Sequence, residues 1–244
     1  MKLEDNKNIL CTISAGYSSI MMALKIKEWY PYHNVVYVMA NTSKEHKESL
    51  VFMNKCDDYF ELNMNWIEAV FNPIKGKGVD FRVVKYKDLK IKGEIFEDGI
   101  KKLGIASKIN AWCNRDMKQV PVKKFADSIF GLNNYSIAVG MRADRVGKAY
   151  RTNNTFYPLL DNGITTKERN KFWDKQPIKI GIPAYKGNCD LCYKKSNRKI
   201  MTVLKEDPFS SEWWNDMIKK YSKISIEGKP SYNAYAENGG MNFY

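Results

Sequence analysis

Short apolar runs alternate with stretches of helical periodicity over the first part of the chain, and no other feature constrains the fold as strongly. The apolar runs cover 9–13, 35–40 and 65–70, and the helical stretches cover 19–29 and 45–59. This order predicts an α/β fold, in which a parallel twisted sheet of the Rossmann-like type carries helices on both faces. Ligands bind such sheets beyond the carboxyl ends of the strands, so the loops 14–19 and 41–45 are the first candidates for a site.

The loop after the first apolar run consists of small and hydroxyl residues. It leads directly into the first predicted helix, so its backbone N–H groups and the positive helix end would face an anion. Small residues let a phosphate approach the backbone, and serine hydroxyls add donors. The candidate phosphate loop comprises Ser14, Ala15, Gly16, Tyr17, Ser18 and Ser19. The alternative is an ordinary strand-to-helix turn that binds nothing.

Similar local signals predict the rest of the chain. Helices are expected at 95–103, 118–129, 166–175 and 212–221, and a further strand at 135–141. Many lysines and two glycines between 72 and 98 indicate a basic, partly mobile loop, and the polar stretch 222–244 indicates a loosely ordered tail. We therefore expect one α/β nucleotide-binding domain over residues 1–205 and a C-terminal helix and tail over 206–244.

The chain is strongly basic: its 244 residues include 40 lysines and arginines against 27 acids, a formal net charge of +13. Such a charge favours an anionic partner, either a nucleotide or a nucleic acid. No apolar run approaches the roughly 20 residues needed to span a bilayer, and the first residues lack a secretory pattern. We therefore expect a cytoplasmic protein without a membrane partner. Its five cysteines are then thiols or metal ligands rather than a disulfide framework.

Six segments, taken in order, resemble one family of nucleotide-binding proteins. They are the loop 14–19, then 40–48, 112–121, 139–145, the block 157–173 with its Pro-Leu and Thr-Thr pairs, and 187–196 with its Cys-x-x-Cys spacing. Over roughly residues 8–205 the chain is similar to the phosphoadenosine phosphosulfate reductase-like branch of the adenine nucleotide alpha-hydrolase superfamily, the PP-loop ATP pyrophosphatases and their relatives. The small versions found in phage and bacterial genomes are the nearest in pattern. Ala15 stands where the family has glycine, and Ser18 where it has aspartate or threonine.

The resemblance implies that an adenine nucleotide, ATP or a relative with Mg²⁺, binds over the strand tips. The nucleotide-binding set that it implies is the loop 14–19 with Asn41, Thr42, Glu45 and Gly140. The catalytic set that it implies is Arg142, Arg145 and Lys118. A guanidinium such as that of Arg142 can hold phosphate or sulfate through two hydrogen bonds. The alternative for Arg142 is a surface arginine that caps its strand.

Three cysteines are candidate metal ligands. Cys189 and Cys192 have the Cys-x-x-Cys spacing, which suits a metal, a redox disulfide or a buried pair of thiols. Cys113 belongs to a segment that the resemblance brings over the same strand ends. Three thiolates with one open position suit a [4Fe–4S] cluster, as in some PP-loop sulfur-transfer enzymes, and zinc with a fourth ligand is the alternative.

The expected function is ATP-dependent adenylation of an acceptor with release of pyrophosphate, followed by sulfur transfer. A tRNA or DNA base is the acceptor that the basic charge suits, and a homodimer is an assembly that we consider. Phosphoadenosine phosphosulfate reduction ranks second, because that reaction needs a cysteine in a C-terminal tail and 222–244 contains none. A non-catalytic module that binds nucleotides or nucleic acid is the third reading, motivated by Ala15 and Ser18.

Overall fold

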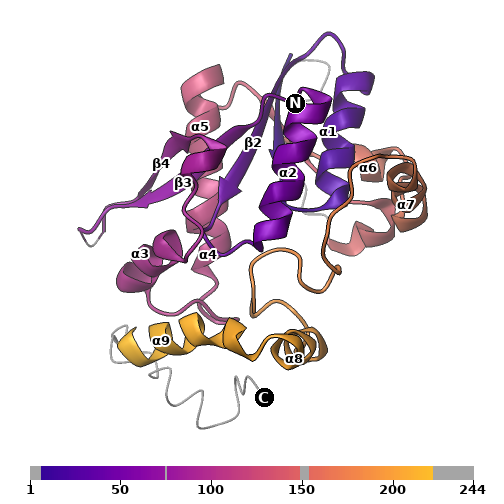
Figure 1. The fold of residues 1–244 in the computed structure, drawn as a ribbon. Helices are drawn as coiled ribbons and strands as arrows, with labels where there is room; N and C mark the ends of the chain where they lie inside the picture. Colours follow the sequence, from indigo (N-terminus) through magenta and orange to yellow (C-terminus); the bar gives the residue numbers. More distant parts are fainter. Residues whose placement is uncertain (1–6, 75, 149–153, 222–244) are drawn as a thin grey trace.

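The computed structural model describes residues 7–74, 76–148 and 154–221, and its centre is a six-stranded sheet (Figure 1). The strands are β1 (Asn8–Ile13), β2 (Asn34–Asn41), β3 (Asn65–Phe71), β4 (Val79–Val84), β5 (Ser136–Val139) and β6 (Thr155–Phe156). They lie in the order β4-β3-β2-β1-β5-β6, and every neighbouring pair is parallel except β3 with β4. The predicted α/β class is confirmed.

Helices follow the strands much as the periodicity predicts. They are α1 (Tyr17–Trp29), α2 (Lys47–Phe60), α3 (Glu94–Leu103), α4 (Trp112–Asn114), α5 (Val120–Phe130), α6 (Pro158–Asp161), α7 (Thr166–Asp174), α8 (Asn197–Glu206) and α9 (Glu212–Tyr221). Thr165 begins α7 with a capping box, in which its hydroxyl accepts from the Lys167 N–H and Glu168 accepts from the Thr165 N–H. Helix α8 was not predicted. None of the described helices combines the length and the apolar character needed to cross a lipid bilayer.

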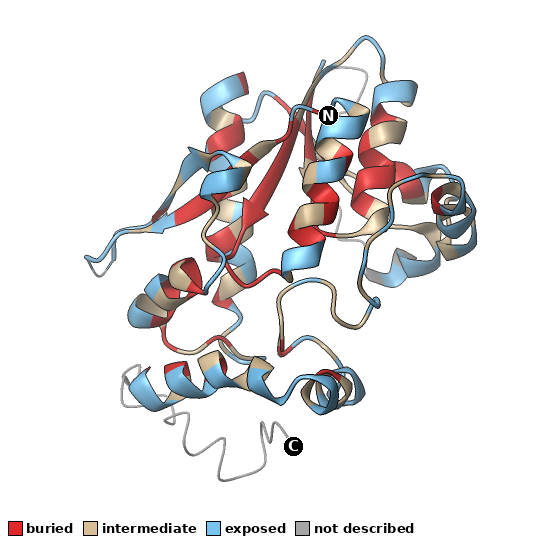
Figure 2. Cartoon of the chain, viewed as in Figure 1, coloured by how far each residue is buried: buried red, intermediate tan, exposed pale blue. Residues whose placement is uncertain are grey.

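The central strands bury both of their faces, because helices cover the sheet on two sides. Ile9 and Cys11 of β1 point into a core shared with α1 and α2, whereas Leu10 points into a core shared with Phe125 and Ala126 of α5. This alternation is the period of two that a strand imposes on its side chains. Figure 2 shows the result: the inner strands are buried, and the outward sides of the covering helices are exposed.

The segment 72–98 is not the loop that its lysines suggested. Residues 79–84 form β4, which pairs antiparallel with β3 so that Arg82 lies opposite Glu68. The two side chains form an ion pair at 2.5 Å, and the Glu68 side chain is fully buried. The alternating Val-Asp-Phe-Arg-Val-Val pattern favours a strand, and the glycines before it favour a turn. The prediction was wrong because the lysines were given more weight than this pattern.

A second hydrophobic cluster lies beyond the carboxyl ends of the parallel strands. It joins α3, α4, α8 and α9 through buried aromatic side chains, among them Phe96, Trp112 and Trp214. In Figure 1 these helices form a layer below the sheet. Trp214 is buried in this packing and ties α9 to α3 through its contact with the Phe96 ring. The cluster leaves the loops at the strand ends between two packed layers.

Candidate functional site

The candidate site lies where the strand order reverses. Strand β1 pairs with β2 on one side and with β5 on the other. From β1 the chain adds β2, β3 and β4 on one side of β1, and it later adds β5 and β6 on the other side. Such a switch point opens a crevice at the carboxyl ends of the strands. The loops after β1, β2 and β5 therefore border one region, and each carries residues that the sequence singles out.

The loop after β1 is a tight turn that presents the start of α1. Gly16 is the N-cap residue and makes no side-chain cap, so the first N–H groups of α1 receive no side-chain acceptor from it. The Ser19 hydroxyl donates to the carbonyl oxygens of Ser14 and Gly16, which holds the turn closed from within. Ala15 is 6% exposed and belongs to the hydrophobic core. Its φ is not positive, so alanine replaces glycine there without backbone strain.

Gly140 lets the end of β5 approach this loop closely. A Cβ atom at Gly140 would lie 3.0 Å from Ser19 Cα and 3.2 Å from Ser19 N, both backbone atoms. A side chain at this position would therefore push the end of β5 away from the first turn of α1. The structure places Gly140 against the phosphate loop, where it has a packing role.

Arg142 joins the β5 exit to the phosphate loop. Its Nη1 atom donates to Ser18 Oγ at 2.8 Å, and its Nε donates to Asp144 Oδ1 at 3.0 Å and to Thr166 Oγ1 at 3.2 Å. Hydrogen bonds from Thr166 and Arg142 lower the pKa of Asp144 to about 2. The structure thus brings Arg142 and Ser18 together, as a shared anion site requires, while Arg145 is exposed on the following turn.

Asn41, at the end of β2, is buried and shapes the next loop from inside. Its Nδ2 donates to Glu68 Oε1 at 2.8 Å and to the Lys90 carbonyl at 2.7 Å, and its Oδ1 accepts from the Ser43 N–H at 3.0 Å. Every polar atom of the amide is therefore engaged within the protein. In this structure Asn41 acts on the site by fixing the loop.

Glu45 is the centre of a buried polar cluster beside that loop. Its Oε2 accepts from the Thr42 N–H at 3.0 Å and from the Thr42 hydroxyl at 2.5 Å, and its Oε1 lies 3.2 Å from Lys118 Nζ. The Cys189 thiol lies 3.7 Å from Glu45 Oε1 and 3.3 Å from Thr42 Oγ1. The cluster brings together Thr42, Glu45, Lys118 and Cys189 from three segments of the sequence.

Charges in this cluster shift the pKa values of its members. Burial lowers the pKa of Lys118, but Glu45 and Cys189 raise it further than burial lowers it, so its ammonium form is favoured. Burial first and Glu45 second raise the pKa of the Cys189 thiol, against the opposing charge of Lys118. The cluster therefore holds a protonated thiol beside an ion pair.

An irregular helical turn places Lys118 in this cluster. Residues Arg115–Gln119 form a π-helical turn between α4 and α5, and the Val120 N–H donates to the Arg115 carbonyl, five residues back. Pro121 lies in the first turn of α5, directly after this π-helical turn. A proline has no N–H to donate to the carbonyl four residues before it, and its ring clashes with that carbonyl. The widened turn accommodates this defect. It also directs Lys118 toward Glu45.

In the part of the chain that the structure describes, the three candidate cysteines are not grouped as metal ligands are. Cys113 contacts the Tyr193 hydroxyl at 3.5 Å, and Cys189 contacts Thr42 and Glu45. Within 7–74, 76–148 and 154–221, no three His, Cys, Asp or Glu side chains converge as metal ligands do. Burial and then Cys113 raise the pKa of the Tyr193 hydroxyl, with smaller effects of Cys192 and Cys189. Cys113 is therefore the thiol in hydrogen-bond contact with Tyr193.

The segment 187–196, called the cysteine loop below, is held to α9 by a contact centred on a lysine. The sequence did not indicate this contact. Lys44 Nζ lies 2.8 Å from Asp190 Oδ2 and 4.3 Å from the Trp213 ring centroid. Trp214 Nε1 donates to Asp190 Oδ1 at 2.9 Å, and the Asp190 N–H donates to the Lys44 carbonyl at 2.9 Å. In the sequence, only the neighbouring Trp213 and Trp214 indicated that α9 packs against another element. The spacing along the chain does not reveal which distant residues they contact.

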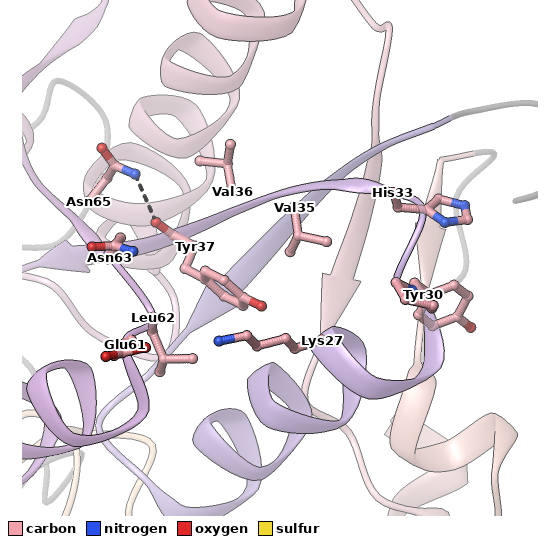
Figure 3. A pocket seen from close by; sticks show the side chains of 11 residues that line it. Lys27, Tyr30, His33, Val35, Val36, Tyr37, Glu61, Leu62, Asn63 and Asn65 are labelled. Carbon is pink, nitrogen blue, oxygen red and sulfur yellow. Dashed lines mark hydrogen bonds between the residues drawn. The ribbon is translucent and has the colours of Figure 1, made fainter.

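A pocket of about 370 Å³ lies elsewhere, at the amino end of β2 (Figure 3). Lys27 at the end of α1 and Glu61 after α2 border it, and Asn65 Nδ2 donates to the Tyr37 carbonyl at its edge. This is the edge of the sheet opposite the phosphate loop. The pocket is therefore separate from the candidate site.

The fold and this site define an α/β protein with a serine-rich loop after β1 and a buried polar cluster that includes the Cys189 thiol, both at the carboxyl edge of the sheet. No known protein-family profile matches the chain. Its sequence is 27% identical over 188 residues to the uncharacterized nin region protein ORF290 of Escherichia phage lambda. That alignment covers 76% of this chain, and the chain spans 65% of the length of the phage protein.

Among solved structures, the chain is similar to the U34-tRNA thiolase NcsA from Methanococcus maripaludis, determined with its [4Fe–4S] cluster. The TM-score is 0.51 at 16% sequence identity, over 93% of this chain and 77% of the thiolase chain. The likeness supports the α/β fold described above.

Proposed function

We propose that the chain is an enzyme of the PP-loop superfamily that uses ATP to adenylate a nucleic-acid base and then replaces the activated oxygen with sulfur. One observation carries this proposal. The loop 14–19 follows β1, Arg142 follows β5, and Thr42, which contacts the Cys189 thiol, follows β2, and these three strands are neighbours in the sheet. Adjacent strands are about 4.8 Å apart, so a nucleotide on the loop reaches the thiol side of the crevice.

The phosphate side of the proposal rests on donors that converge from two elements. The start of α1 supplies N–H groups and the positive end of a 13-residue helix, and Ser18 and Arg142 supply a hydroxyl and a guanidinium. Mg²⁺ bound with the nucleotide would neutralise part of the triphosphate charge. Ser14, Gly16 and Ser19 shape the loop around these donors.

The acceptor side rests on charge and on the structural likeness. The chain carries a net charge of +13, which favours a polyanionic partner, and the similar thiolase acts on tRNA. We therefore propose a tRNA base as the acceptor, with DNA as the alternative within the same chemistry. A [4Fe–4S] cluster or zinc on Cys113, Cys189 and Cys192 remains a hypothesis, and no step below depends on it.

The proposed chemistry has two displacements. The base oxygen attacks the α-phosphorus of ATP, the bond to the bridging oxygen breaks, pyrophosphate leaves and the ring nitrogen releases its proton. A sulfur nucleophile of the hydrosulfide class then attacks the activated carbon, and AMP leaves with the oxygen. Arg142 and the α1 N-terminus offset the charge that develops on phosphate, and the Glu45–Lys118 pair orients the Cys189 side of the crevice.

The test is to incubate the protein with ATP, Mg²⁺, sulfide and either bulk tRNA or DNA, and to measure AMP and pyrophosphate. The proposal expects acceptor-dependent release of both products and a thiolated nucleoside by mass spectrometry. Ser18→Ala should reduce turnover at least tenfold, because it removes a loop donor, whereas Ser128→Ala on the exposed side of α5 should not. ATP binding without turnover on any acceptor would contradict the proposal in favour of a binding module.

A further inference from the structure

One face of α7 lies along the first turn of α1. Thr166 and Trp173 lie on this face, and Arg169 lies between them at helical spacings of three and four. Thr166 Oγ1 contacts Arg142 Nε at 3.2 Å. Trp173 Nε1 donates to the Tyr17 carbonyl at 2.9 Å, and the Trp173 ring stacks on the Tyr17 ring at 4.5 Å between centroids. Both neighbours of Arg169 on this face therefore touch the phosphate loop or its arginine.

Arg169 has no acidic partner among the residues that the structure describes. Its Nε and Nη2 atoms donate to Asn170 Oδ1, at 3.1 and 2.6 Å, and this oxygen is neutral. Arg142, in contrast, has the Asp144 carboxylate at 3.0 Å. Arg169 is thus a partly buried cation without a carboxylate in contact among the described residues.

The electrostatics agree with this geometry. Burial lowers the pKa of Arg169, and the charge of Arg142 lowers it further, with a smaller effect of Arg145. Asp144 and Tyr17 act in the opposite direction. In the described part of the chain, Asp144 is the one carboxylate that acts on Arg169, and Arg142 already contacts it at 3.0 Å. The resulting excess of positive charge beside the start of α1 favours a ligand with more than one negative charge.

We infer that Arg169 binds the pyrophosphate portion of the nucleotide that the phosphate loop holds, and so selects a triphosphate over a monophosphate. The inference rests on the proposed function. A planar guanidinium binds phosphate through two hydrogen bonds, and Arg169 would exchange the neutral Asn170 oxygen for this charged acceptor. The neighbouring α1 N-terminus favours the same anion. Neither the phosphate-loop pattern nor the Gly-Met-Arg segment includes Arg169, because it comes from a helix later in the chain.

The inference is tested by calorimetric titration of the wild-type protein and of Arg169→Ala with three probes: Mg·ATP, AMP and inorganic pyrophosphate. Arg169→Ala should weaken ATP and pyrophosphate binding about tenfold or more, the loss expected for a charge-assisted bidentate contact. Its AMP affinity should change less than about twofold. The ATP and pyrophosphate affinities of Arg169→Lys should lie between those of the wild type and Arg169→Ala, because an ammonium keeps the charge but cannot form the two paired hydrogen bonds.

Lys171→Ala provides the matched control, since Lys171 is an exposed cation on the same helix. It should leave all three affinities unchanged. A purely structural role for Arg169 would instead weaken AMP and ATP alike and lower the melting temperature, and that result overturns the inference.

Two further outcomes separate the inference from the proposed function. If the wild-type protein binds ATP and Arg169→Ala binds it equally well, the inference fails and the proposed function stands. If the wild-type protein binds pyrophosphate through Arg169 but does not bind ATP, the proposed function fails and the phosphate site stands.

Discussion

At the scale of single residues, the site contains buried charges that would destabilise the folded protein if they lost their oppositely charged partners. Glu45 is 2% exposed in its side chain, and Lys118 supplies the one ammonium in contact with it among the described residues. If a buried carboxylate loses the cation paired with it, the free-energy cost of its desolvation remains but the attraction that offset this cost is gone. Such pairs are therefore sensitive to the removal of one member.

Lys118→Met should destabilise the protein by about 1–3 kcal/mol, which is less than for a fully buried pair because the Lys118 side chain is 36% exposed. Urea unfolding at pH 7 measures this change. Lys123→Met, at an exposed position on α5, is the control and should change the free energy of unfolding by less than about 0.5 kcal/mol. Equal stability of Lys118→Met and the wild type would show that the ion pair is not formed in solution.

The Asp144 carboxylate should make stability depend on pH in the acid range. Its pKa in the folded protein is lowered to about 2, whereas an unfolded chain gives about 3.9. The folded state therefore favours the charged form, and this stabilisation is present above about pH 4 and is lost as the pH falls toward 2.

Urea unfolding of the wild type and Asp144→Asn between pH 5 and pH 2 measures this effect. The difference in unfolding free energy between the two proteins should shrink as the pH falls. A difference that stays constant over this range would contradict the contact of Asp144 with Arg142 and Thr166.

At the scale of elements, close packing fixes how α3 lies on α4. A Cβ atom at Gly99 of α3 would lie 2.3 Å from the Trp112 ring and 2.9 Å from the Phe71 ring. Both rings are packed, so neither has free space into which to move.

Gly99→Ala should therefore destabilise the protein by about 1–3 kcal/mol through overpacking, although alanine has the higher helix propensity. Thermal unfolding followed by circular dichroism measures this loss. Gly78→Ala is the control, because nothing lies within 4 Å of the added atom, and it should leave the melting temperature nearly unchanged. A stabilised Gly99→Ala would mean that α3 packs differently.

The elements themselves were largely predictable from the sequence, because each rests on a local pattern. The runs at 9–13, 35–40 and 65–70 became β1, β2 and β3, and the helical stretch at 166–175 became α7. β4 was missed because lysines flank the alternation at 79–84, and α8 was missed because basic residues interrupt the apolar face at 197–206. The polar tail at 222–244 lies outside the described residues, and the boundary at 205 remains a prediction.

The candidate site was predictable only in part. The phosphate loop and Arg142 follow from strand ends that local patterns reveal, and the structure joins them through Ser18. The grouping of Glu45, Lys118 and Cys189 was not predictable, since it depends on tertiary packing and on the turn before Pro121. Arg169 carried no signal, because a lone arginine on a helix has the same pattern as any solvated residue.

At the scale of the whole molecule, part of the net charge of +13 is concentrated on the segment that follows Cys189 and Cys192. The end of the cysteine loop and α8 expose cations without an acidic partner among the described residues: Lys194, Arg198, Lys199 and Lys205. The nearby Glu206 is already paired with Lys186 at 2.8 Å. If the proposed function holds, this face lies where the acceptor nucleic acid approaches.

The triple variant Lys194→Gln, Arg198→Gln, Lys199→Gln should therefore weaken tRNA binding and reduce its dependence on salt, by roughly two to three in the slope of log K against log salt. Fluorescence anisotropy over a range of salt concentrations measures both. A control that replaces three exposed lysines on other elements, Lys55, Lys123 and Lys171, removes the same charge and should have a much smaller effect. Equal effects of the two variants would show only a general attraction of the basic protein for polyanions.

The contact of Lys44 and Asp190 with Trp213 and Trp214 also bears on how the protein is completed during synthesis. A ribosome adds residues from the amino end, so the first five strands emerge long before α9 does. Until Trp214 emerges, the carboxylate beside Cys189 lacks its indole donor and the loop lacks its cover. The loop 14–19 is therefore synthesised well before α9, and the cover over Asp190 is complete only after α9 has been added.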